Sequence, residues 1–67
     1  MTTEELKAIE SLAWEARDLL VKAHESVPSG ADHVLSTALF AATQAAVVAS
    51  NLAYERATKS LLLEPPA

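Results

Sequence analysis

The sequence has no cysteine, a single glycine and one residue each of Trp, Tyr and Phe. Without cysteine, no disulfide can brace the fold. A structural zinc site is disfavoured because the only soft ligands are His24 and His33, nine residues apart. A chain of 67 residues buries too little apolar surface for a large core of its own. We therefore expect self-association to supply the missing stability.

Positive charge is also sparse, with five Lys and Arg residues against nine Asp and Glu residues. DNA and RNA polymers are bound by clustered cations that displace counterions, so a nucleic-acid-binding module is not expected. The segment MTTEELKAIE is acidic, whereas a secretory signal is basic and then apolar. The sequence therefore predicts a cytoplasmic protein.

Helix-breaking residues gather at one place between the ends of the chain, in the segment VPSGAD at residues 27–32. Before this segment, Thr2 and Glu5 have the spacing of a capping box, in which each residue bonds to the backbone of the other. This spacing predicts a first helix over about residues 3–26.

After the breaker segment, Ser29 and Asp32 repeat the capping-box spacing and predict a second helix over about residues 31–62, followed by a short C-terminal tail. The predicted turn covers residues 27–31. The expected fold class is all-α: a single-domain antiparallel two-helix hairpin that assembles into a symmetric helical-bundle oligomer.

Both predicted helices carry apolar residues at alternating three- and four-residue steps, which is the pattern of a seam between packed helices. In the first helix these are Leu6, Ile9, Ala13, Ala16, Leu20, Ala23 and Val27. In the second helix they are Leu35, Ala38, Ala42, Ala45, Ala49 and Leu52. Alanine dominates the second set, so we expect the two backbones to approach closely.

The second helix has more apolar surface than one neighbouring helix covers. Phe40, Val47 and Tyr54 form a further row at seven-residue spacing, inside an uncharged run that extends from Val34 to Tyr54. We predict an oligomer interface formed by Phe40, Val47, Val48 and Tyr54. A membrane-spanning helix is a minor alternative, because the run contains polar residues and many alanines that insert poorly into lipid.

Six residues are candidates for ligand binding because they combine aromatic rings with basic side chains. They are Trp14, Arg17 and His24 in the first helix, and Tyr54, Arg56 and Lys59 in the second. Rings can stack on a nucleobase while cations bind its phosphate. In the alternative interpretation Trp14 packs at a protein interface and the arginines pair with nearby acidic residues.

No catalytic residue, metal site or cofactor is predicted. Either Ser26 or Ser29 could combine with His24 and Asp32 around the turn, but a hairpin offers no scaffold to hold such a group beside an oxyanion hole. His24 and Glu25 are adjacent in sequence, which separates them on a helix, so they cannot act as the Glu-x-x-His pair of a di-iron bundle.

The chain length, the turn VPSGADH and the segment LSTALFAATQAAVVASNLA resemble the short helical-hairpin proteins that phages carry as sponges for the cyclic oligonucleotides of CBASS immunity. The similarity covers about half of the chain, and Val47 and Val48 stand where that family has a tryptophan. The resemblance implies a homo-oligomer in the host cytoplasm that binds cyclic di- or trinucleotides between protomers without hydrolysing them. The other hypothesis is an interaction or assembly module that binds a partner helix through the Phe40, Val47 and Tyr54 row.

Overall fold

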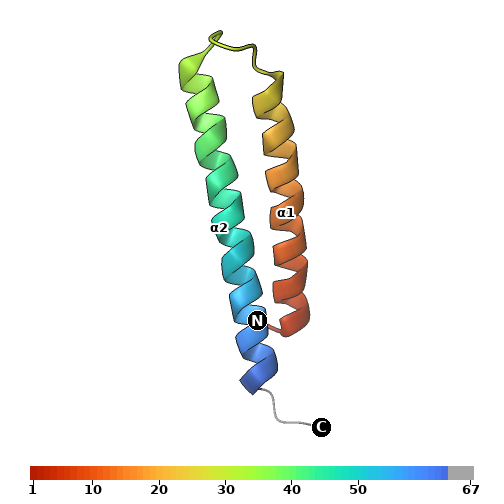
Figure 1. Ribbon diagram of the computed structural model, residues 1–67. Coiled ribbons are helices and arrows are strands. Elements are labelled where there is room, and N and C mark those ends of the chain that lie inside the picture. Colours follow the sequence, from red (N-terminus) through yellow and green to blue (C-terminus); the bar gives the residue numbers. More distant parts are fainter. Residues whose placement is uncertain (64–67) are drawn as a thin grey trace.

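The computed structural model describes residues 1–63, with side chains as far as Leu61, and forms an antiparallel helical hairpin (Figure 1). Helix α1 spans Thr3–Ser26 and helix α2 spans His33–Leu63, and the two helices pack against each other. The predicted all-α hairpin is therefore confirmed. Leu63, predicted to start the C-terminal tail, ends α2 instead, and the rest of that tail, residues 64–67, lies outside the described residues.

Helix α1 begins and ends through local interactions that the sequence encodes. The Thr2 hydroxyl accepts the Glu5 N–H at 3.1 Å, and the Thr2 N–H donates to the Glu5 carboxylate at 3.0 Å, which completes the predicted capping box. At the other end Val27 is extended because Pro28 follows it, and its N–H donates to the His24 carbonyl at 3.2 Å.

Helix α2 begins later than predicted, because the turn occupies the residues that were expected to cap it. Gly30 adopts a positive φ of 76°, and the Ala31 N–H donates to the Pro28 carbonyl at 3.0 Å. The N-cap is therefore Asp32, whose carboxylate accepts a backbone N–H three residues later at 2.9 Å. Ser29, predicted as the cap, lies in the turn.

The seam between the helices differs from the predicted seam. On α1 the buried or half-buried residues at alternating three- and four-residue steps are Thr3, Leu6, Glu10, Ala13, Arg17, Leu20 and, after a step over exposed His24, Val27. On α2 they are Ser36, Leu39, Thr43, Ala46, Ser50, Ala53, Ala57 and Ser60. The predicted α2 seam is wrong by one residue, since all of its members except half-buried Ala42 are exposed.

Hydroxyl groups explain why the seam runs along this line of α2. The Thr3 hydroxyl donates to the Ser60 hydroxyl at 2.9 Å, and the Ser50 hydroxyl donates to the Glu10 carbonyl at 3.4 Å. Ser50 has no solvent exposure at all. Because α2 is apolar on most of its circumference, small residues that allow close approach and can bond across the seam decide which line faces α1.

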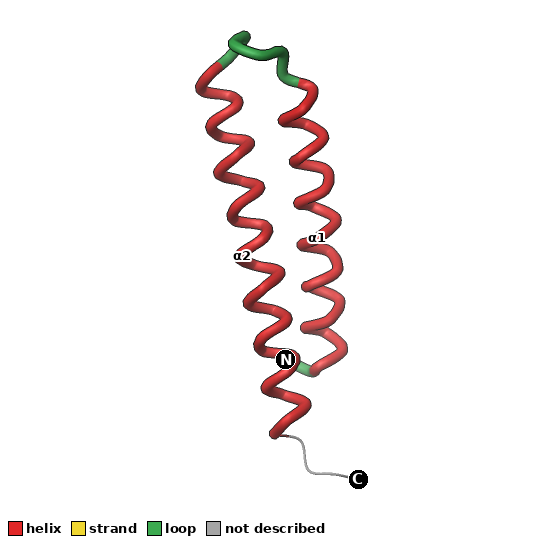
Figure 2. The backbone as a smooth tube through the Cα atoms, in the orientation of Figure 1, coloured by secondary structure: helices red, strands yellow, loops and turns green. Residues whose placement is uncertain are grey.

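The two helices draw together toward the end of the hairpin opposite the turn, here called the open end (Figure 2). The buried residues within the described part of the chain all belong to this half: Thr3, Leu6, Ser50, Ala53 and Ala57. Nearer the turn, seam residues are only half-buried. The tightest packing therefore lies at the open end.

Candidate interaction surface

The seam defines two long sides of the hairpin. Its register is fixed by the Thr3 to Ser60 and Ser50 to Glu10 hydrogen bonds, which pair the start of α1 with the end of α2. In antiparallel helices, residues that directly follow seam positions project to one side from both helices, and residues that directly precede them project to the other. Each side can therefore be read from both helices together.

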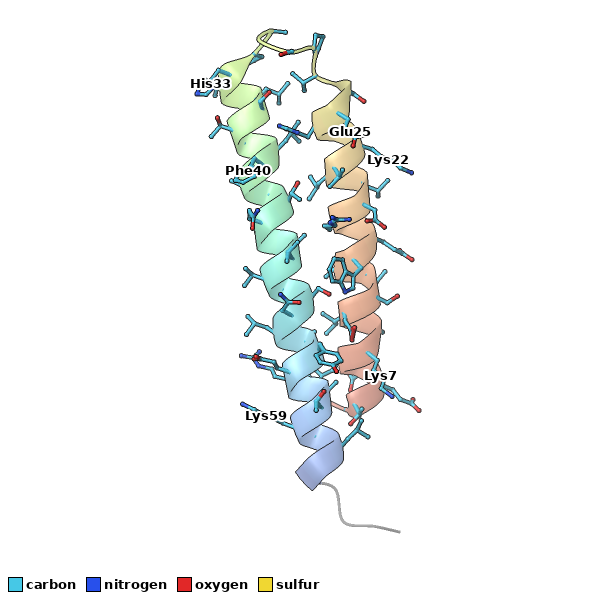
Figure 3. All side chains as sticks on the ribbon, in the orientation of Figure 1. Lys7, Lys22, Glu25, His33, Phe40 and Lys59 are labelled. Atoms are coloured by element: carbon cyan, nitrogen blue, oxygen red, sulfur yellow. The ribbon has the colours of Figure 1, made fainter. Side chains whose placement is uncertain are left out.

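The side that follows the seam contains every aromatic residue of the chain and is here called the aromatic side. It consists of Trp14 and Val21 from α1 with Phe40, Val47, Tyr54 and Leu61 from α2. Trp14 is 40% exposed, Phe40 58% and Tyr54 59%. Figure 3 shows Phe40 on α2, away from the space between the helices. The three rings are thus available to a partner along one side of the molecule.

Trp14 is held in place by its neighbours on α1. The Arg17 guanidinium lies over the Trp14 ring, with its central carbon 5.8 Å from the ring centroid. The same guanidinium donates to the Asp18 carboxylate at 3.0 Å. The Arg17 charge therefore already has a ring on one side and a carboxylate beside it.

Polar residues border the aromatic side on both helices. The bordering row of α1 contains Glu4, Ser11, Asp18 and Glu25, and that of α2 contains Thr37, Gln44, Asn51 and Thr58. The cations on this side are Lys7 and the seam residue Arg17, whose guanidinium extends to Trp14 and Asp18. With three carboxylates against two cations, this side has no surplus of positive charge.

The six candidate ligand-binding residues do not form one cluster. Trp14, Arg17 and Tyr54 share the aromatic side, with Tyr54 about one heptad, or roughly 10 Å, further toward the open end. Arg56 and Lys59 directly precede seam positions and project to the other side. Figure 3 shows Lys59 pointing outward from α2, away from α1. His24, the sixth residue, lies near the turn.

A hollow of about 610 Å³ lies at the turn, and its wall includes His24, Glu25, Asp32 and His33. These four residues are exposed. Within residues 1–63, no group of three or more His, Asp or Glu side chains comes together in a way that could hold a metal ion. The hollow is therefore a gap between diverging helix ends with no evident ligand set.

Of the predicted interface residues, Phe40, Val47 and Tyr54 lie on the aromatic side, with Val47 half-buried beside the seam. Val48 lies about 100° further around α2, on its outer surface, and is 55% exposed. The predicted interface therefore spans two surfaces of α2 that face different directions.

The side that precedes the seam carries a second apolar surface, here called the aliphatic side. It includes Ile9, Ala16 and Ala23, which were predicted as seam residues of α1 but are exposed. It consists of Ile9, Leu12, Ala16, Leu19 and Ala23 from α1 with Leu35, Ala38, Ala42, Ala45, Ala49 and Leu52 from α2. Leu12 is 62% exposed and Leu19 is 66% exposed. The alternating three- and four-residue spacing of the α1 members is the signal that could have revealed a second face.

Helix α2 is long and apolar enough, over His33–Leu61, to cross a bilayer by length and composition alone. Little of its most apolar stretch is buried within the hairpin. This agrees with apolar residues on every side of α2 and adds nothing specific to a membrane.

Comparison with protein-family models, with curated proteins and with solved structures gives no match to this chain. The functional argument therefore depends on the two sides of the hairpin themselves.

Proposed function

We propose that this chain is a non-enzymatic helical interaction module that binds a helix of a partner protein through its aromatic side. The observation that carries the proposal is that Trp14, Phe40 and Tyr54, the only aromatic residues, are all exposed on one side of the hairpin. Aromatic side chains are enriched at protein interfaces because they bury a large area at low entropic cost. An amphipathic helix could place its apolar face against this row of exposed rings.

The charge around the aromatic side favours a protein over an anionic ligand. Glu4, Asp18 and Glu25 border it, and the Arg17 guanidinium is already engaged by Asp18. A nucleotide would meet these carboxylates and lose the phosphate contacts that free cations supply. The amides and hydroxyls of α2 can instead hydrogen-bond to the polar rim of a protein partner.

The second candidate function is sequestration of cyclic oligonucleotides by an oligomer. The observation in its favour is the Arg17 guanidinium stacked on Trp14, with Tyr54 on the same side. Rings and a guanidinium are the groups that stack on bases and bind phosphates. Such a ligand would have to displace Asp18 from Arg17. Both candidate functions are placed in the cytoplasm, and neither includes a chemical step.

Photo-crosslinking in the source cells tests the first proposal directly. A photoreactive amino acid replaces Phe40 in one variant, Tyr54 in a second and Val34 in a control, where Val34 is 78% exposed on the outer surface of α2. We expect the first two variants to capture the same protein and the control to miss it. Equal capture from all three positions, or none from any, contradicts the proposal.

Trp14 provides a second, independent measurement, because it is the only tryptophan. A partner helix on the aromatic side should shift its fluorescence to shorter wavelength and protect it from acrylamide quenching. Cyclic di- and trinucleotides, added in place of the partner, should leave both the fluorescence and the melting temperature unchanged. A nucleotide-dependent rise in melting temperature would favour sequestration instead.

A further inference from the structure

The aliphatic side is unusual for a surface exposed to water, because it is apolar along most of its length. Between the open end and the turn it carries no charged residue on either helix. Ile9 is 40% exposed, Leu35 46% and Leu52 43%, in addition to the more exposed leucines of α1. Contiguous apolar surfaces of this length are found on soluble chains where another protein or a membrane covers them.

The two helices contribute different shapes to this side. Helix α1 supplies the projecting side chains Leu12 and Leu19, whereas the central part contributed by α2 is alanine: Ala38, Ala42, Ala45 and Ala49. The side is thus a ridge along α1 next to a shallow channel along α2. A ridge and a channel on the same molecule are complementary to each other, so a second copy of this surface fits the first.

We propose that the aliphatic side binds a second copy of this chain, with the two open ends together and α1 of each copy lying on α2 of the other. A two-fold axis parallel to the hairpin produces this arrangement. It sets Leu12 near Ala49 of the second copy and Leu19 near Ala42, according to the register of the seam. Reversing one copy would instead stack leucine ridge on leucine ridge and leave the alanine channels apart.

Charge at the open end selects the same orientation. Glu5 lies at the open end of the aliphatic side on α1, and Arg56 and Lys59 lie at the same end on α2. With open ends together, Glu5 of each copy faces the basic pair of the other, so attraction occurs twice by symmetry. In the reversed arrangement these charges would face the turn of the other copy.

The area of the aliphatic side is also sufficient for a stable interface between two copies. At 1.5 Å per residue the 24-residue α1 is about 36 Å long, and two adjacent helices are roughly 20 Å wide. A second hairpin would therefore cover roughly 700 Å² of each copy, close to the ~800 Å² per partner of a stable interface. This self-association goes beyond the proposed function and does not depend on it, because it uses the opposite side.

Sedimentation of matched charge variants tests the surface. The unaltered protein should sediment at twice its 7.1 kDa mass. Leu19→Glu should raise the dimer dissociation constant at least about thirtyfold, by placing a charge inside the interface. Val48→Glu adds the same charge to the outer surface of α2 and should leave the dimer intact. Circular dichroism of both variants verifies that the hairpin still folds.

Several outcomes of this experiment would overturn the proposal. A mass of 7.1 kDa for the unaltered protein excludes self-association. A dimer that Leu19→Glu leaves intact excludes the aliphatic side. A dimer in which Trp14 becomes protected from acrylamide as concentration rises places the contact on the aromatic side. Flotation of the monomer with lipid vesicles assigns the surface to a membrane.

The orientation has a separate test, made simple because the chain has no cysteine of its own. An equal mixture of Leu12→Cys and Ala49→Cys proteins should oxidise mainly to the mixed disulfide, since these residues meet only across the proposed interface. Ala16→Cys alone should cross-link slowly. Rapid formation of an Ala16→Cys dimer indicates that the copies run in opposite directions and contradicts the aligned arrangement.

Discussion

The aromatic and aliphatic sides are both long and exposed, but they differ in composition. The aromatic side places three rings among carboxylates, amides and hydroxyls, so it stays hydrated when nothing is bound. The aliphatic side has only aliphatic groups until the charges at the open end. Permanent interfaces are more apolar than those that form and dissociate. The difference agrees with the two contacts proposed above, a permanent one between copies on the aliphatic side and a reversible one on the aromatic side.

The largest effect is expected where neither side is involved, in the seam itself. Ala53 is 5% exposed, so Ala53→Glu should bury an unpaired charge and destabilise the hairpin by at least about 3 kcal/mol, enough to unfold it. Ala45→Glu makes the same substitution eight residues away on the aliphatic side, where the residue is exposed. That variant should keep its helices and lose only the dimer.

Circular dichroism with urea denaturation measures the first result, and sedimentation measures the second. The pair decides where the seam lies, because the pattern of apolar residues in the sequence places Ala45 in the seam. If Ala45→Glu unfolds the protein and Ala53→Glu does not, the observed seam is incorrect and so are both sides defined from it.

The second-largest effect is expected from shortening a leucine of the seam, and it can be compared with removal of a ring from the aromatic side. Leu6 is 8% exposed, and Leu6→Ala should cost about 2 kcal/mol or more of unfolding free energy. Phe40 is 58% exposed, so Phe40→Ala should change that free energy by no more than about 0.5 kcal/mol while weakening partner binding. A large loss of stability in Phe40→Ala would show that the aromatic side is covered within the protein's own assembly.

The parts of this fold that sequence predicts are those set by neighbouring residues. The Thr2 and Glu5 capping box and the end of α1 before Pro28 depend on contacts a few residues apart, and both occur as expected. The seam residues of α2 depend on which of several rows of residues along the helix packs against α1. The spacing of apolar residues cannot identify that row when nearly every row is apolar. Ser50, polar and fully buried, lies in the row that forms the seam.

The candidate site was predictable to a similar degree. Seven-residue spacing alone places Phe40, Val47 and Tyr54 on one stripe, and they do share the aromatic side. Tyr54 and Arg56, by contrast, are two residues apart, which separates them by about 200° around the helix. Helical geometry therefore already excludes Arg56 from a cluster with the ring. Trp14 belongs to α1, so its position on the same side as this stripe of α2 could be known only from the register between the two helices.

A smaller effect is expected at Arg17, which distinguishes the two possible ligands of the aromatic side. Arg17→Ala removes the contact with Trp14 and the pair with Asp18, and should cost about 1 kcal/mol or less, because both are partly exposed. The Trp14 emission should change, and binding of a partner helix should persist. Thermal melting with cyclic di- and trinucleotides provides the contrast, since a stabilisation that Arg17→Ala abolishes would favour the nucleotide.

The smallest effect concerns acid and the Glu5 carboxylate at the open end of the aliphatic side. The backbone N–H of Thr2, and then its hydroxyl, hold the pKa of Glu5 below its usual value of 4.5. A carboxylate whose pKa is lowered by folding stabilises the folded state above its usual pKa, and this contribution disappears as the pH falls through the lowered value. Acidification from about pH 6 to about pH 3 should therefore loosen the start of α1 and remove the Glu5 charge that faces the second copy.

Sedimentation and urea denaturation across that range, for the unaltered protein and for Glu5→Gln, measure this contribution. Glu5→Gln should be less stable near neutral pH and should lose less on acidification, whereas Glu15→Gln, on the outer surface of α1, should behave like the unaltered protein. Acrylamide quenching of Trp14 should not follow the dissociation of the dimer. If quenching and dissociation change together, the two sides are coupled, and the separation of a permanent from a reversible surface fails.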